Sequence, residues 1–144
     1  NMTTSGSTTQ DFNTLSNNTV ATTWTDNSTI ASWYSQRTGS GTTYQSGSGT
    51  STTGNMYSFC LNTSATDKAI GSIGSGNATA GNFAHGVLLR NTSGAVLTNL
   101  TVAYTGEQWR RENVAAQTIT FWYKTHTRRE GGREGGWGRE GAER

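Results

Sequence analysis

The tetrapeptide Glu107-Gln108-Trp109-Arg110 brings together three side chains that could bind a ligand. A carboxylate accepts hydrogen bonds, a guanidinium donates them from a planar fork, and an indole offers a flat apolar face. The tetrapeptide directly follows a run in which apolar and polar residues alternate, so we place it at the end of a strand. Two roles are open: contact with a ligand, or an ion pair that orders the turn after the strand. We expect the ion pair, between Glu107 and a nearby arginine, most simply Arg110 and otherwise Arg111.

Aromatic residues are numerous for so polar a chain. Exposed aromatic faces are what sugar-binding modules place against pyranose rings, but a β core poor in leucine also needs aromatic side chains for its volume. We therefore expect most of them in the core. Trp122 is the expected exception, because it alternates with Ile119, Phe121 and Tyr123 and so faces the other side of its strand. The residues that could contact a ligand are Trp33, Tyr44, Glu107, Trp109, Arg110 and Trp122.

The sequence carries no catalytic or metal-binding signature. Its few acids form no acid–base motif, and no Gly-x-Ser-x-Gly elbow is present. His85 is a lone histidine in an apolar stretch, where a core histidine is the ordinary interpretation, so we expect no metal. Cys60 is the one cysteine and excludes an intrachain disulfide. We expect no enzyme activity and no cofactor. The acids before the C-terminal stretch are Asp11, Asp26, Asp67, Glu107 and Glu112.

The composition favours an all-β protein. Hydrophobic residues make up 31% and charged residues 14% of the 144 positions, and Thr, Ser, Asn and Gly fill the difference. Low charge argues against ordinary disorder, threonine favours strands, and Gly, Asn and Ser favour turns. No window shows a sustained helical stripe.

Short alternating segments with turn residues between them predict a sandwich, although closure into a barrel stays open. We expect an antiparallel, jelly-roll-like β-sandwich over residues 9–124, with Tyr104 and Phe121 in its core. A hairpin centred on Tyr44 is expected within 38–54, in preference to a flexible linker. The predicted strands are 11–15, 30–37, 56–60, 67–73, 83–90, 95–105 and 118–123.

Residues 125–144 differ abruptly from the rest. They hold five Arg and four Glu in an Arg-Glu-Gly-Gly array, which predicts a disordered, low-complexity tail. The glutamates offset the attraction of the arginines for phosphate, and the net charge of the whole chain is only +2, so we expect no nucleic-acid partner. No apolar run approaches the ~20 residues of a membrane span. We interpret the chain as a fragment of a longer protein.

Several segments, taken together, resemble an accessory domain that recurs in large secreted bacterial exoproteins. The resemblance covers roughly residues 10–124 and implies an extracellular β-sandwich with no established chemistry, often beside nuclease, lamin-tail or sorting-signal modules. The chain departs from the pattern at Cys60, where relatives usually have glycine, and in its tail. The segments are 12–15, 33–34, 37–44, 54–59, 67–72, 86–91 and the most specific one, Tyr104-Thr-Gly-Glu-Gln-Trp-Arg110.

Three functions follow as hypotheses. The first is a non-catalytic, extracellular or cell-surface accessory module of a larger secreted bacterial protein, whose partners are neighbouring domains of the same polypeptide. The second is a carbohydrate-binding module that uses exposed aromatics and has a glycan as its partner. The third is a small enzyme, which would require paired acids in a cleft. We expect the first.

Overall fold

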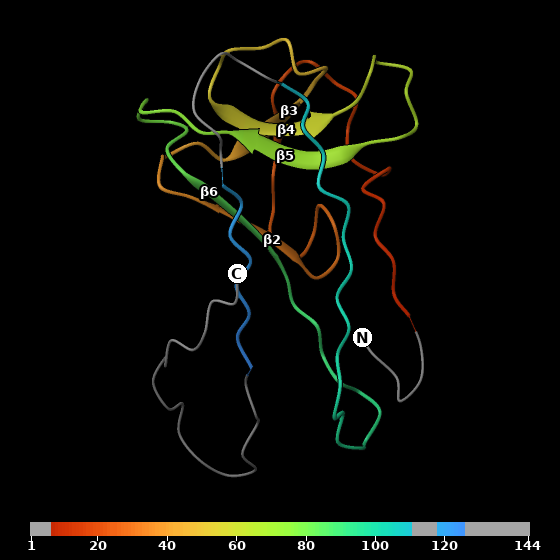
Figure 1. Cartoon of the computed structure of the whole chain (residues 1–144). Coiled ribbons are helices and arrows are strands. Elements are labelled where there is room, and N and C mark those ends of the chain that lie inside the picture. Colours follow the sequence, from red (N-terminus) through yellow and green to blue (C-terminus); the bar gives the residue numbers. More distant parts are fainter. Residues whose placement is uncertain (1–6, 111–117, 126–144) are drawn as a thin grey trace. The chain divides into compact units, whose positions relative to one another are not determined.

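The computed structural model describes residues 7–110 and 118–125. The chain divides into two compact units, residues 1–111 and residues 112–144. The first unit contains every strand of the described residues, and none of these residues lies in a helix (Figure 1). The predicted all-β class is therefore confirmed. The described part of the chain accordingly contains no helix that is long and apolar enough to cross a membrane.

Within residues 7–110, six strands form two sheets. A four-stranded sheet has the order β1-β3-β4-β5, and a two-stranded sheet pairs β2 with β6 (Figure 1). Three of the four neighbouring pairs are antiparallel, as predicted, whereas β3 and β4 run parallel, which makes the larger sheet mixed. The strands are β1 (Thr22–Thr23), β2 (Trp33–Arg37), β3 (Thr43–Gly47), β4 (Asn55–Phe59), β5 (Ala69–Ile73) and β6 (Phe83–Val87).

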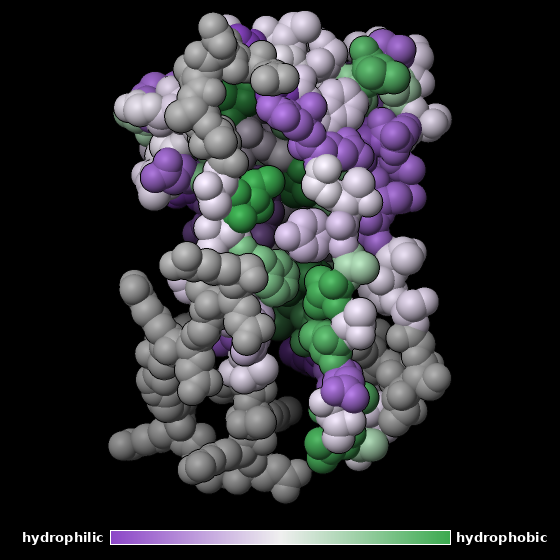
Figure 2. Space-filling view, in the orientation of Figure 1, coloured by the Kyte–Doolittle hydropathy of each residue, from purple (hydrophilic) through white to green (hydrophobic). Residues whose placement is uncertain are grey.

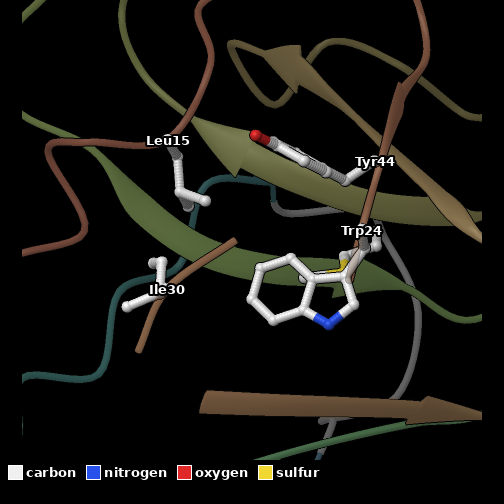
Figure 3. Packing of buried hydrophobic residues seen from close by; sticks show 5 residues of the cluster. Leu15, Trp24, Ile30 and Tyr44 are labelled. Atoms are coloured by element: carbon white, nitrogen blue, oxygen red, sulfur yellow. The ribbon is translucent and has the colours of Figure 1, made fainter. Parts of the chain in front are cut away.

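The core lies between the two sheets, as in a sandwich. Tyr44 and Met56 point into it from the larger sheet, and Leu15, Trp24 and Ile30 come from the loops around β1 (Figure 3). The core also receives side chains from the smaller sheet, Trp33 and Phe83, and from residues Phe12 and Ile70. Aromatic rings thus supply much of the volume that leucines supply elsewhere, as the composition suggested.

Because β3 and β4 run parallel, residues 48–54 must carry the chain from the end of β3 back to the beginning of β4. Parallel strands are usually joined by a crossover of a dozen or more residues, so this connection is short. Gly49 has a φ of +83°, a left-handed conformation that side chains resist. The hairpin predicted over 38–54 is therefore wrong: Tyr44 lies within a strand that pairs antiparallel with β1 and parallel with β4.

The two C-terminal strands predicted from alternation are not strands. Residues 95–105 and 118–123 have no regular structure, and the predicted core residues Tyr104 and Phe121 are 70% and 48% exposed. Figure 2 shows hydrophobic residues on the surface among polar ones. Alternation specifies which side chains would share a face, but a strand forms only where a neighbouring strand takes its backbone hydrogen bonds. Other exposed apolar residues of these segments are Val96, Leu100, Val102, Ile119 and Tyr123.

The first predicted strand, 11–15, is also wrong. Phe12 has a φ of +59°, and the Leu15 amide donates to the Phe12 carbonyl over 3.0 Å, so the segment is a turn. Its apolar residues still enter the core, as Leu15 is buried and Phe12 meets Trp33 edge to face at 4.7 Å. Of the remaining predicted strands, 30–37, 67–73 and 83–90 are confirmed with shorter bounds, and 56–60 is confirmed with a shift of one residue, to 55–59. Residues 126–144 of the predicted tail lie outside the described residues.

Candidate functional site

Segment 107–110 lies across the connection between β3 and β4. The Trp109 ring stacks on Phe59 of β4, with 5.7 Å between ring centroids and 11° between planes. The Arg110 guanidinium donates to the carbonyls of Thr50 and Ser51, over 3.0 and 2.8 Å. These contacts hold the short parallel crossover against the sheet, so the segment has a structural role.

The predicted ion pair between Glu107 and Arg110 is wrong, and the alternative partner, Arg111, lies outside the described residues. The Glu107 carboxylate accepts a hydrogen bond of 2.7 Å from the indole Nε1 of Trp109, two residues along the chain, and Arg110 turns to backbone carbonyls instead. A carboxylate and an indole N–H at this spacing can meet within one turn, which removes the need for an ion pair. The contact orients the indole over Phe59. The order that we expected from a pair of charges thus comes from a charged hydrogen bond and ring stacking.

Gly49 allows the two segments to approach. A Cβ built there would lie 1.9 Å from the Trp109 carbonyl oxygen, and φ is positive. At Gly94 φ is also positive, but a Cβ would meet nothing. We expect Gly94→Ala to lower the free energy of unfolding by about 1 kcal/mol through backbone strain alone. Gly49→Ala should cost at least about 1 kcal/mol more, because segment 107–110 must also move. Urea unfolding of both variants measures the difference; equal costs would show that the segment is not held there.

The other predicted ligand contacts do not join this segment. Tyr44 is 3% exposed, and its hydroxyl accepts a hydrogen bond from the Ser16 amide over 3.2 Å, so it belongs to the core. Trp33 packs on the same core from β2. Trp122 is 66% exposed, as predicted, and belongs to the second unit. Tyr44 and Trp33 therefore pack into the core, as expected of most aromatics, and do not provide the exposed aromatic faces that the carbohydrate-binding hypothesis uses.

A groove lined by polar and apolar atoms in about equal measure lies beside the beginning of β3. It has a volume of about 420 Å³ and runs between the end of β2 and the turn that leads into β3. A carboxylate, a guanidinium and an amide line it together with small hydroxyl residues. The lining residues that matter below are Trp24, Asp26, Gln36, Arg37, Ser40 and Thr42.

Asp26 is held in a fixed orientation at this groove. Its Oδ1 accepts hydrogen bonds from the Trp24 indole Nε1 over 2.7 Å and from the Ser35 amide over 2.8 Å. Its Oδ2 receives one long hydrogen bond, of 3.3 Å, from the exposed side chain of Gln36. One oxygen therefore fixes the loop before β2, and the other keeps most of its capacity to accept a donor.

Arg37 provides the opposite charge. Its Nη2 donates to the Thr43 carbonyl over 2.7 Å, its Nη1 donates to Asn55 over 3.3 Å, and its Cζ lies 4.9 Å from the Phe83 ring centroid. Partial burial lowers the pKa of Arg37 below its ordinary value, although an arginine stays protonated in proteins. The remaining N–H groups have no acceptor among the described residues. The groove thus presents acceptors and donors side by side.

A histidine with buried ring nitrogens lies on β6, beside β2. His85 pairs directly with Ser35 across the strands and stacks on Phe83 at 6.3 Å. Both its ring nitrogens and the Ser35 hydroxyl are buried without a hydrogen-bond partner in the described residues. Burial, and secondarily the charge of Arg37, lowers the pKa of His85 to about 4. The ring is therefore neutral at neutral pH.

Sequence reasoning named Asp26 only as an acid without a motif and passed over Gln36 and Arg37 as site residues. One signal was available: Trp24 and Asp26 stand two residues apart in a turn-rich segment, a spacing that suits an indole–carboxylate hydrogen bond.

A second hollow, of about 340 Å³, offers no charged side chain. It is lined by Thr38, Gly39, 75–78, Gly81 and Asn82. Within the described residues no three His, Cys, Asp or Glu side chains gather as metal ligands.

Comparison with protein-family models, curated proteins and solved structures found no match to this chain. The resemblance to an exoprotein domain therefore rests on the sequence motifs alone, and the function is argued below from the geometry.

Proposed function

We propose that this protein is a non-catalytic, extracellular accessory module of a larger secreted bacterial protein. The observation that carries the proposal is the use of the charged side chains: they tie loops to the sheets. Arg110 binds the crossover 48–54, Arg37 binds the start of β3, and Asp26 fixes the loop before β2. Lys68 similarly donates through its ammonium group to the carbonyl of Asn13.

This arrangement suits a domain whose task is to keep a shape. A charged side chain that is hydrogen-bonded to the protein's own loops and strands holds those segments in place. Asp26 is held in that way at its Oδ1. The polar composition fits a place outside the cytoplasm, and a small secreted domain with a single buried cysteine and no intrachain disulfide suits a bacterial exoprotein.

The absence of catalysis can be tested on the full chain. We expect incubation with cellulose, xylan, mannan and starch to release no reducing ends above buffer. Release that is lost in Asp26→Asn and kept in Asp67→Asn, an equal change of charge at an exposed acid, would overturn the proposal. The pair of variants separates chemistry at the groove from contaminating hydrolases.

Carbohydrate binding is the second candidate, and the groove at Asp26 and Arg37 favours it. Binding modules orient a ligand with a few fixed polar groups in a concave surface. Exposed aromatics, which the hypothesis used at first, are not what supports this candidate. Its support is the array of hydrogen-bonding groups in the groove.

A further inference from the structure

We propose that the groove between the end of β2 and the start of β3 binds a neutral carbohydrate, with Asp26 Oδ2 accepting from a sugar hydroxyl and Arg37 donating to a sugar oxygen. The proposal rests on the carbohydrate-binding candidate and adds to it the place and the class of ligand. It differs from the carbohydrate-binding hypothesis based on exposed aromatics, because the contacts are hydrogen bonds to charged groups.

The mixed charge of the groove selects the ligand class. A carboxylate accepts only, and a guanidinium donates only. An anionic ligand would gain from Arg37 but would meet the negative charge of Asp26, and a cationic ligand would meet the reverse. A hydroxyl group both donates and accepts, so a neutral polyol satisfies both side chains at once. Adjacent hydroxyls on a pyranose ring place a donor and an acceptor within reach of neighbouring protein groups.

Both charged groups are already positioned for such a ligand. Two hydrogen bonds hold Asp26 at its Oδ1, and the one bond at its Oδ2 is long and comes from Gln36, which is exposed and can turn toward a ligand. Arg37 is fixed by Thr43 and Asn55 and lies over Phe83. Little side-chain freedom would be lost on binding, which lowers the entropic cost of a weak contact.

The wall of the groove is fixed as well. The amides of Gly39, Ser40 and Gly41 donate to the carbonyls of Ala80, Ala78 and Thr79, over 2.9 to 3.2 Å. A Cβ at Gly41 would lie 2.7 Å from Arg37 Nη1 and 2.6 Å from the Thr79 oxygen. A larger residue would therefore displace the guanidinium, so this turn sets the width of the groove on the side of Arg37.

The test is calorimetric titration of the full chain with cellohexaose, xylohexaose and mannohexaose, with oligogalacturonate as the acidic probe. We expect at least one neutral oligosaccharide to bind in about the millimolar range or tighter, and the acidic probe to bind at least about tenfold more weakly. Asp26→Asn is the central variant, because an amide keeps an oxygen for Trp24 and Ser35 but replaces Oδ2 by a donor. It should weaken binding about tenfold or more.

Two further variants keep the result decisive. Asp67→Asn makes the same change of charge at an exposed acid outside the groove, and it should bind as the parent does. If Asp26→Asn fails to fold, Gln36→Ala and amide chemical-shift changes at Ser40 and Thr42 on titration take its place. If the parent and Asp26→Asn bind an oligosaccharide equally well, the protein binds carbohydrate but not in this groove, and the proposed site is wrong. Preference for oligogalacturonate would overturn the ligand class. No binding of any probe would overturn both.

Discussion

Lowering the pH from about 7 to about 4 should reduce the free energy of unfolding by about 2 to 3 kcal/mol through His85 alone. Its pKa is about 4 in the folded protein, below the 6.5 of a free histidine, because burial and the charge of Arg37 disfavour the imidazolium ion. Between about pH 4 and 6.5, the unfolded chain therefore binds a proton at His85 that the folded protein does not bind. The stabilising contribution is complete above about pH 6.5, falls as the pH decreases toward 4, and is absent below about 4.

His85→Phe isolates this effect. Phenylalanine keeps a planar ring beside Phe83 and removes both nitrogens that lack a hydrogen-bond partner in the described residues. We expect the variant to be at least as stable as the parent at pH 7, since an unpaired buried polar group is costly. Its urea midpoint should change much less between pH 7 and about 4.5, a range in which the parent's histidine term falls. A parent whose midpoint stays constant over this range would contradict the buried, neutral histidine.

Tyr57→Ala should remove much of the stability of the fold. Tyr57 is fully buried in β4, its ring stacks on Phe59 at 5.1 Å, and its hydroxyl donates to the Thr53 carbonyl over 2.8 Å. Truncation of a large buried aromatic costs about 3 to 5 kcal/mol. That is a large share of the roughly 5 to 15 kcal/mol that stabilises a domain of this kind. Thermal or urea unfolding measures the loss.

Two control variants separate the contribution of the Tyr57 ring from that of its hydroxyl and from that of an exposed side chain. Tyr57→Phe keeps the ring and loses only the hydroxyl contacts with Thr53 and Ser51, so it should cost about 1 to 2 kcal/mol. Leu61→Ala removes an exposed side chain and should change stability by less than about 0.5 kcal/mol. A loss in Tyr57→Ala no greater than that in Tyr57→Phe would mean that the ring contributes little to the core.

The strands that were predictable share a simple property: each has a neighbour within the described residues. Residues 33–37, 55–59, 69–73 and 83–87 each pair with a neighbouring strand. Residues 95–105 and 118–123 alternate clearly and are not strands. Alternation of apolar and polar residues indicates which side chains would share one face of a strand, whereas strand pairing depends on residues far away in the sequence. The parallel partner of β3 was unpredictable for the same reason.

The candidate site was predictable only as a list of residue types. Glu107, Trp109 and Arg110 were named together as candidate residues, but the partners of Trp109 and Arg110 lie at 49–51 and 59, which no local pattern indicates. Asp26 and Arg37 are eleven positions apart in the sequence, and the turn at 38–42 brings both to one groove. Spacing in the sequence could not predict this, because the groove is formed by a turn that has no motif.

The parallel crossover has a consequence for the order in which the protein folds. The bond from Arg110 to Thr50 joins residues 60 positions apart, so the crossover between β3 and β4 stays unsecured until the chain has been made through residue 110. Closing so long a loop carries an entropic cost that must be met before the contact forms, which slows folding relative to folds built on local contacts. During synthesis β3 and β4 can leave the ribosome early, while the contacts that secure their parallel pairing arrive last.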